Sequence, residues 1–173
     1  MSDANIGKKM VEEQHLSYFL DAYITITGTS LAVFSSGESP DFICARTSGD
    51  LIGVELARSP HDHDLAVHNR IWTDRTMESY DLLDAISASI TAKERKRRSP
   101  HWRMPNNTIL VIELLDYSFD SLHWTTDSSL NNDYANAGFI EIWFADHSTL
   151  ETFGEVPLIG LFPQEIDVNV KEK

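Results

Sequence analysis

Two acidic residues flank a short polar turn between two apolar runs. Asp41 opens the first run, Asp41 to Ala45, and Glu55 lies near the end of the second, Leu51 to Ala57. The turn between the runs, Arg46 to Asp50, predicts a hairpin that brings both carboxylates to one point. With a backbone carbonyl and waters they would form the oxygen-rich site that Mg²⁺ or Mn²⁺ prefers, and such an ion serves phosphodiester hydrolysis. The alternative is a turn aspartate and a glutamate on a solvated strand edge.

The letters around this pair resemble a known family. The chain reads Ser39-Pro-Asp-Phe-Ile43, and Glu55 stands in the phrase Leu51-Ile-Gly-Val-Glu-Leu-Ala-Arg58. This pattern resembles the PD-(D/E)XK nuclease superfamily, and the order of predicted elements is similar from about Lys8 to Pro163. The resemblance implies a restriction endonuclease-like α/β fold, a mixed β-sheet flanked by helices. It also implies a metal-dependent nuclease in which Asp41 and Glu55 are catalytic and bind Mg²⁺ or Mn²⁺.

The chain departs from the family pattern two positions after the glutamate. The family has a lysine there that orients or activates water, and this chain has Ala57. Some members of the family supply the lysine from the following helix, and Lys93 is the candidate here. It shares a helical face with Ile86 and Ile90, whereas Lys96 lies about a quarter-turn away. The alternative for Lys93 is a long side chain at the edge of the core with its ammonium in water.

A further carboxylate comes from the leading helix in many members of the resembled family. Glu12 and Glu13 both qualify, and Glu12 falls nearer the centre of the apolar stripe of this helix. A carboxylate on an apolar face needs a partner because burying its charge alone is costly. We therefore expect Glu12 to support the catalytic site, with the alternative of a first-turn glutamate favoured by the helix dipole.

Charge constrains the partners of the chain. It has 27 acidic and 14 basic residues and a net charge of −13, which argues against a protein that only coats nucleic acid. Five basic residues fall within positions 93–98 and form either a solvated helix end or a phosphate-binding region. We expect the Lys93–Arg98 region to bind nucleic acid, DNA in preference to RNA. The net charge and Ala57 favour an alternative, a catalytically inactive nuclease-like protein that is a binding or immunity module, with a homodimer or protein partner left open.

A cluster of histidines raises a third functional hypothesis, a zinc site. His61, His63 and His68 lie near Asp62 and Asp64, but their spacing does not place the ligands of a zinc site on one helical face. A solvated loop is the favoured interpretation, and a zinc hydrolase is a distant alternative. The sequence has no nucleophile-elbow, P-loop or dinucleotide glycine motif.

The elements that must position these residues follow from periodicity and turn signals. Two helices are predicted, Lys8 to Tyr23 and Glu78 to Arg98, and the stretch Ile24 to Ser36 is strand or irregular. Besides the hairpin, three strands are predicted, and the first of them suits a position buried on both faces. These are Thr108 to Leu115, Phe139 to Ala145 and Val156 to Phe162.

Composition sets the class of protein. The chain has 173 residues, 42% of them apolar, which predicts a single domain over residues 1–173 with a short polar N-terminus and a C-terminal tail. One cysteine, Cys44, cannot form an internal disulfide. No apolar run approaches the roughly 20 residues of a membrane helix, and no secretory signal is visible. We therefore expect a cytoplasmic protein with no membrane partner.

Overall fold

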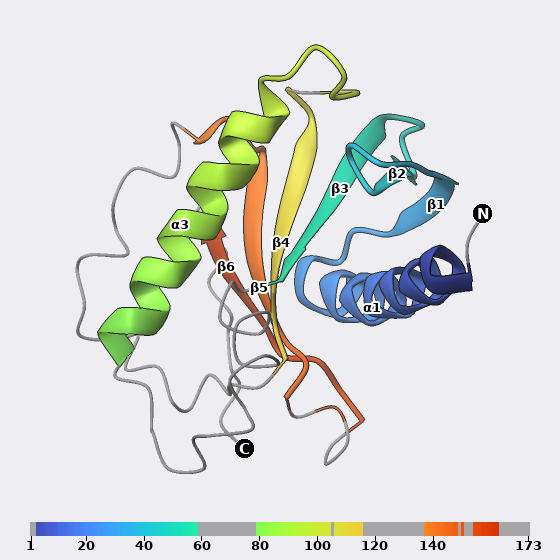
Figure 1. Cartoon of the computed structure of the whole chain (residues 1–173). Helices are drawn as coiled ribbons and strands as arrows, with labels where there is room; N and C mark the ends of the chain where they lie inside the picture. The colour runs from blue at the N-terminus through green and yellow to red at the C-terminus, as the bar shows by residue number, and fades with distance from the viewer. Residues whose placement is uncertain are drawn as a thin grey trace.

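The computed structural model describes residues 3–58, 79–104, 106–115, 137–148, 150 and 154–162, and for residues 3–6 and 79–85 it describes the backbone alone. These residues form a mixed six-stranded sheet with one helix on each side (Figure 1). The order along the chain is α1 (Asp3–Thr27), β1 (Leu31–Ser36), β2 (Phe42–Arg46), β3 (Leu51–Arg58), α3 (Ser79–Arg97), β4 (Thr108–Leu114), β5 (Glu141–Asp146) and β6 (Leu158–Phe162).

The strands lie in the sheet in the same order as in the chain. β1, β2 and β3 form an antiparallel meander, β3, β4 and β5 run parallel, and β6 returns antiparallel to β5. The α/β class and the hairpin of β2 and β3 are confirmed. The solvated loop expected around His61, His63 and His68 lies outside the described residues.

The centre of the sheet is strand β4. All seven of its residues are buried, as predicted for a strand covered on both faces. Because side chains alternate along a strand, Val111 packs with Phe19 on the α1 side, whereas Leu110 and Ile112 pack with α3 on the other. The expected helical stripes supply the covering side chains, with Leu16, Phe19 and Tyr23 from α1 and Ile86 and Ile90 from α3.

Helix α1 is longer than its apolar stripe predicts. The β-branched residues from Ile24 to Thr27 continue the helix, where the sequence left strand or irregular structure open. The helix ends at Gly28, whose φ of 70° is a left-handed conformation that suits glycine, and whose N–H donates to the Ile24 carbonyl. Packing of the preceding turn therefore overrides the weak helix propensity of these residues.

A carboxylate fixes the end of α1 to the sheet. Glu141 of β5 accepts hydrogen bonds from Tyr23 at 3.1 Å, from Arg46 at 3.3 Å and from the Trp143 indole at 2.7 Å. Burial, followed by the Glu141 charge, raises the pKa of Tyr23 to about 12, so this hydroxyl stays protonated and donates. This network sets the position of α1 over the sheet.

Strand β1 is the edge of the sheet next to β2. Its pairing with β2 shifts register between Val33 and Ser35. The side chains of Val33 and Phe34 at this point are exposed. In the described residues, no helix is long and apolar enough to cross a membrane.

A substitution at Gly53 of β3 can test how tightly the hairpin is packed. A Cβ there would lie 2.7 Å from the Pro40 ring and 2.8 Å from the Thr108 hydroxyl. We expect Gly53→Ala to lower the free energy of unfolding by roughly 1 to 3 kcal/mol, because the proline ring cannot move without moving Asp41. Denaturant unfolding measures the change.

The matched control is Gly7→Ala in α1, where an added Cβ meets nothing within 4 Å. That substitution should raise stability by about 0.5 to 1 kcal/mol, since alanine favours helix. A Gly53→Ala protein as stable as the parent would contradict the close packing of Pro40 on β3.

Candidate active site

The two predicted acidic residues lie together, Asp41 directly before β2 and Glu55 in the middle of β3. The backbone N–H of Asp41 donates to Glu55 Oε2 at 3.2 Å, and the backbone N–H of Leu56 donates to Asp41 Oδ2 at 2.9 Å. Each carboxylate therefore accepts a hydrogen bond from the backbone of the other segment. The expectation that Asp41 and Glu55 approach one point is confirmed.

Two lysines of α3 converge on Glu55. Lys93 Nζ lies 2.6 Å from Glu55 Oε1 and 3.0 Å from the Leu56 carbonyl oxygen. Lys96 Nζ lies 3.3 Å from the same Oε1. Lys93, the candidate for the missing lysine, therefore contacts Glu55, and Lys96 joins it because a long side chain spans the quarter-turn between the two positions.

Burial strengthens the charge interactions of Glu55 with Asp41 and the two lysines. The Glu55 side chain is 0% exposed, and its charge is matched by Lys93 and Lys96. Burial, and then the neighbouring Glu55 charge, raises the pKa of Asp41 to about 6, while the Leu56 hydrogen bond and Lys93 oppose the rise. A second carboxylate with a raised pKa beside a buried one is typical of sites where a cation binds or a proton moves.

Glu12 contacts lysines of its own helix. Its carboxylate lies 3.4 Å from Lys8 Nζ and 3.4 Å from Lys9 Nζ. Lys9 in turn donates to the backbone carbonyl of Asp41 at 3.4 Å. Glu12 is therefore linked to the acidic pair through Lys9.

The basic run of α3 does not form one continuous surface. Arg97 is buried, and its guanidinium lies over the Phe139 ring at 5.6 Å. Arg98, the residue that follows α3, pairs with Glu94 one turn earlier. Lys93 and Lys96 are the cations of this run that turn toward the acidic pair.

A second polar cluster lies on the opposite face of the sheet. One ligand atom from each of His15, Glu113 and His147 lies within 4.8 Å of the other two. His15 Nδ1 is 2.9 Å from Glu113 Oε1, and the two imidazole rings stack with centroids 4.4 Å apart. Burial lowers the pKa of His147 to about 4, so its imidazole is neutral at pH 7. We call these three residues the His–Glu–His cluster.

Sequence reasoning did not find this cluster, although signals were present. Glu113 is the charged residue of the run Thr108–Leu115, and His147 comes two residues after the end of the run Phe139–Ala145. β4 and β5 are parallel neighbours, so their carboxyl ends meet at one edge of the sheet. His61, His63 and His68 lie outside the described residues.

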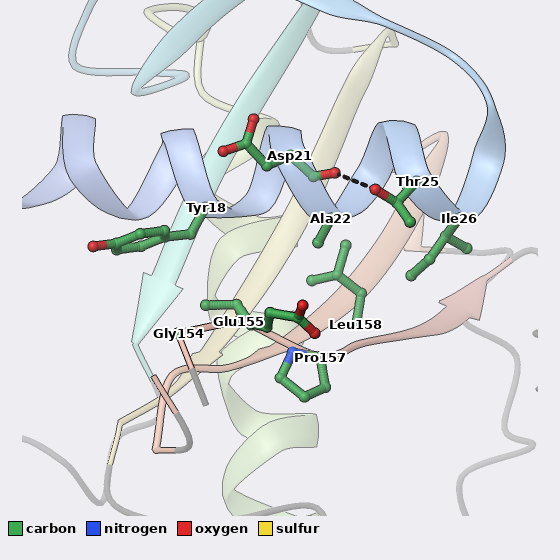
Figure 2. A pocket seen from close by; sticks show the side chains of 10 residues that line it. Tyr18, Asp21, Ala22, Thr25, Ile26, Gly154, Glu155, Pro157 and Leu158 are labelled. Atoms are coloured by element: carbon green, nitrogen blue, oxygen red, sulfur yellow. Dashed lines mark hydrogen bonds between the residues drawn. The ribbon is translucent and has the colours of Figure 1, made fainter. Parts of the chain in front are cut away.

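A groove of about 430 Å³ runs along α1 (Figure 2). Tyr18, Ala22 and Ile26 line it on the helix side, and Pro157 and Leu158 line the other wall. Its lining residues include none from the acidic pair or the His–Glu–His cluster. Its walls offer mainly apolar contact.

Comparison with known proteins adds no relative: no family model, curated protein or solved structure matches this chain significantly.

The raised pKa of Asp41 predicts a pH-dependent stability. It is about 6 in the folded chain, against 3.8 for an ordinary aspartate, so the folded state holds this proton more tightly. Asp41 therefore favours folding below about pH 4, and this contribution is lost as the pH rises through about 6. Asp41→Asn keeps an acceptor for the Leu56 N–H without the charge. In chelator at pH 7, we expect it to be more stable than the parent by roughly 1 to 2 kcal/mol, with a smaller difference at pH 4.

Guanidinium unfolding between pH 4 and 7 measures this difference. Asp21→Asn is the matched control, because Asp21 lies on the exposed side of α1 and the same change of charge there should leave the profile unaltered. If the free energies of unfolding of Asp41→Asn and the parent change in parallel between pH 4 and 7, the raised pKa of Asp41 is contradicted.

Proposed function

We propose that this protein is a metal-dependent nuclease that hydrolyses phosphodiester bonds of nucleic acid, with a restriction endonuclease-like fold. The observation that carries the proposal is the position of Lys93. Its ammonium contacts Glu55 and the Leu56 carbonyl from α3, on the same face of β3 as Ala57. A lysine from the helix thus stands beside the position where the resembled family has a lysine on the strand.

The order of elements supports the same proposal. A leading helix is followed by an antiparallel meander whose second and third strands carry the acids, then by a helix and by a strand parallel to the third. This is the arrangement that the resemblance implies.

The donor atoms of the site suit a hard divalent cation. The Asp41 and Glu55 carboxylates and the Leu56 carbonyl are oxygen donors, the type that Mg²⁺ and Mn²⁺ prefer. Lys93 already bonds to two of these oxygens, so the cluster is built to hold positive charge. When bound, such an ion lowers the pKa of water and offsets the charge of a phosphodiester.

The protein side chains supply positioning and charge. Lys93 is placed to donate a hydrogen bond to the attacking water or to a phosphate oxygen, and Lys96, which is half-exposed, offers a second positive charge to the substrate. Glu12 supports the site through Lys9. The Lys93–Arg98 region is the proposed contact for nucleic acid, DNA in preference to RNA.

One observation favours a second candidate, an inactive nuclease-like binding module. Glu55 is fully buried, and Lys93 and Lys96 both lie within ion-pair distance of its carboxylate. A carboxylate whose charge two lysines already compensate can have a structural role alone. In a catalytic site, the cation must replace at least one of these lysine contacts. Metal binding and cleavage therefore separate the two candidates.

The first test measures cleavage of single- and double-stranded DNA and RNA with Mg²⁺ or Mn²⁺. We expect cleavage by the parent and a loss of at least about 100-fold in Asp41→Asn and Glu55→Gln, because each removes a charged ligand. Asp21→Asn is the matched control, since it removes one carboxylate on the exposed side of α1, away from the proposed site. Calorimetry showing no Mg²⁺ or Mn²⁺ binding, together with no cleavage, would overturn the nuclease and favour the binding module.

The second test moves the lysine. Lys93→Ala should lower the cleavage rate by about 10² to 10⁴-fold while leaving metal binding intact, because its role is toward water and phosphate. Ala57→Lys in the Lys93→Ala background should recover at least about tenfold of that loss, since residue 57 lies two positions from Glu55 on the same face. Full activity of Lys93→Ala would contradict the proposed role.

A further inference from the structure

The His–Glu–His cluster joins three elements that are distant in sequence. His15 comes from α1, Glu113 from β4, and His147 directly follows β5. The α1 face of the sheet carries this cluster, whereas Glu55 and its lysines lie on the α3 face. Glu113 pairs with Arg58 in the sheet and Glu55 with Leu110, so the two carboxylates are three residues apart along the strands, about 10 Å. The cluster is therefore separate from the proposed nuclease site.

The distances within the cluster fit a transition-metal ion. Ligand atoms around tetrahedral Zn²⁺ lie about 3.3 Å from one another, because each bond is about 2.0 to 2.1 Å long. Glu113 Oε1 lies 2.9 Å from His15 Nδ1 and 3.8 Å from His147 Nε2. These two distances bracket the value for zinc, and all three ligand atoms lie within 4.8 Å of one another.

His147 gives an independent reason to expect a ligand. Its side chain is 4% exposed, and neither ring nitrogen forms a hydrogen bond within the described part of the chain. A buried imidazole without a hydrogen-bond partner is uncommon, because removing its nitrogens from water is costly. A metal ion bound through Nε2 would satisfy the group.

We propose that His15, Glu113 and His147 bind a Zn²⁺-like transition-metal ion that fastens α1 to the carboxyl ends of β4 and β5. Two imidazoles and one carboxylate form a ligand set that such ions prefer, whereas Mg²⁺ prefers oxygen ligands. The Arg58 guanidinium, 3.9 Å from Glu113 Oε2, helps to orient the carboxylate from outside the cluster. Three protein ligands leave one position for water.

The test titrates chelator-treated parent protein with Zn²⁺ by calorimetry and with Co²⁺ by visible absorption. With excess Mg²⁺ present to occupy the Asp41 and Glu55 site, we expect one Zn²⁺ or Co²⁺ ion per chain and the absorption bands of four-coordinate Co²⁺. We also expect a melting temperature about 5 to 10 °C higher at a hundredfold excess of free ion over Kd. His147→Ala, His15→Gln and Glu113→Gln should each remove this response to metal.

Matched controls locate the ion. His101→Ala changes an exposed histidine, and His61→Ala with His63→Ala changes two outside the described residues, so all should keep the parent response. Asp41→Asn should keep it as well, which separates this proposal from the nuclease site. X-ray absorption at the zinc edge of the parent protein should show two imidazole ligands, and this measurement does not depend on any variant folding.

Three results would overturn the proposal. They are no Zn²⁺ or Co²⁺ binding by the parent, an unchanged response in folded His147→Ala or Glu113→Gln, and a zinc-edge spectrum without imidazole. A purely structural role of His147 predicts a change of melting temperature that is the same with and without zinc, whereas the metal site predicts a change that depends on zinc.

Discussion

The alternation of side chains along β3 and β4 is the constraint on which the rest of the structure depends. Every residue of β4 is buried, so both faces of the sheet must be covered. α1 covers one face and α3 the other, as Figure 1 shows. Glu55 and Glu113 lie on neighbouring strands but face opposite helices, and each helix brings its own basic or imidazole side chains to one buried carboxylate. Two polar clusters therefore arise from one packing arrangement.

The cost of burying charge explains which side chains gather there. A carboxylate removed from water needs hydrogen bonds and opposite charge nearby. Glu55 receives two lysines and a backbone N–H. Glu113 receives His15 at 2.9 Å and Arg58 only at 3.9 Å, so it is the less fully compensated of the two. The ring nitrogens of His147, beside Glu113, form no hydrogen bond within the described residues. Of the two clusters, the His–Glu–His cluster is therefore the one whose side chains could still bind a ligand.

Local pattern predicts much of this arrangement. The hairpin, the acidic pair and the face of α3 that carries Lys93 follow from turn residues and helical spacing, which are short-range properties. The His–Glu–His cluster does not, because His15 and Glu113 are 98 residues apart and meet only through the packing of α1 on the sheet. Two other outcomes depend on the same long-range packing: Arg97 lies buried over Phe139, and α1 continues through Ile24 to Thr27.

The shift of register in β1 bears on how two molecules can meet. An edge strand presents unpaired N–H and carbonyl groups to any other chain, and a regular edge invites strand-to-strand aggregation. In β1 the irregularity falls between Val33 and Ser35, where the side chains of Val33 and Phe34 are exposed. Such an irregularity bends and twists its strand, which disturbs the hydrogen-bond spacing that a second edge strand would need to pair along β1. The chain can thus leave two apolar side chains in solvent at its sheet edge without extending the sheet from one molecule to the next.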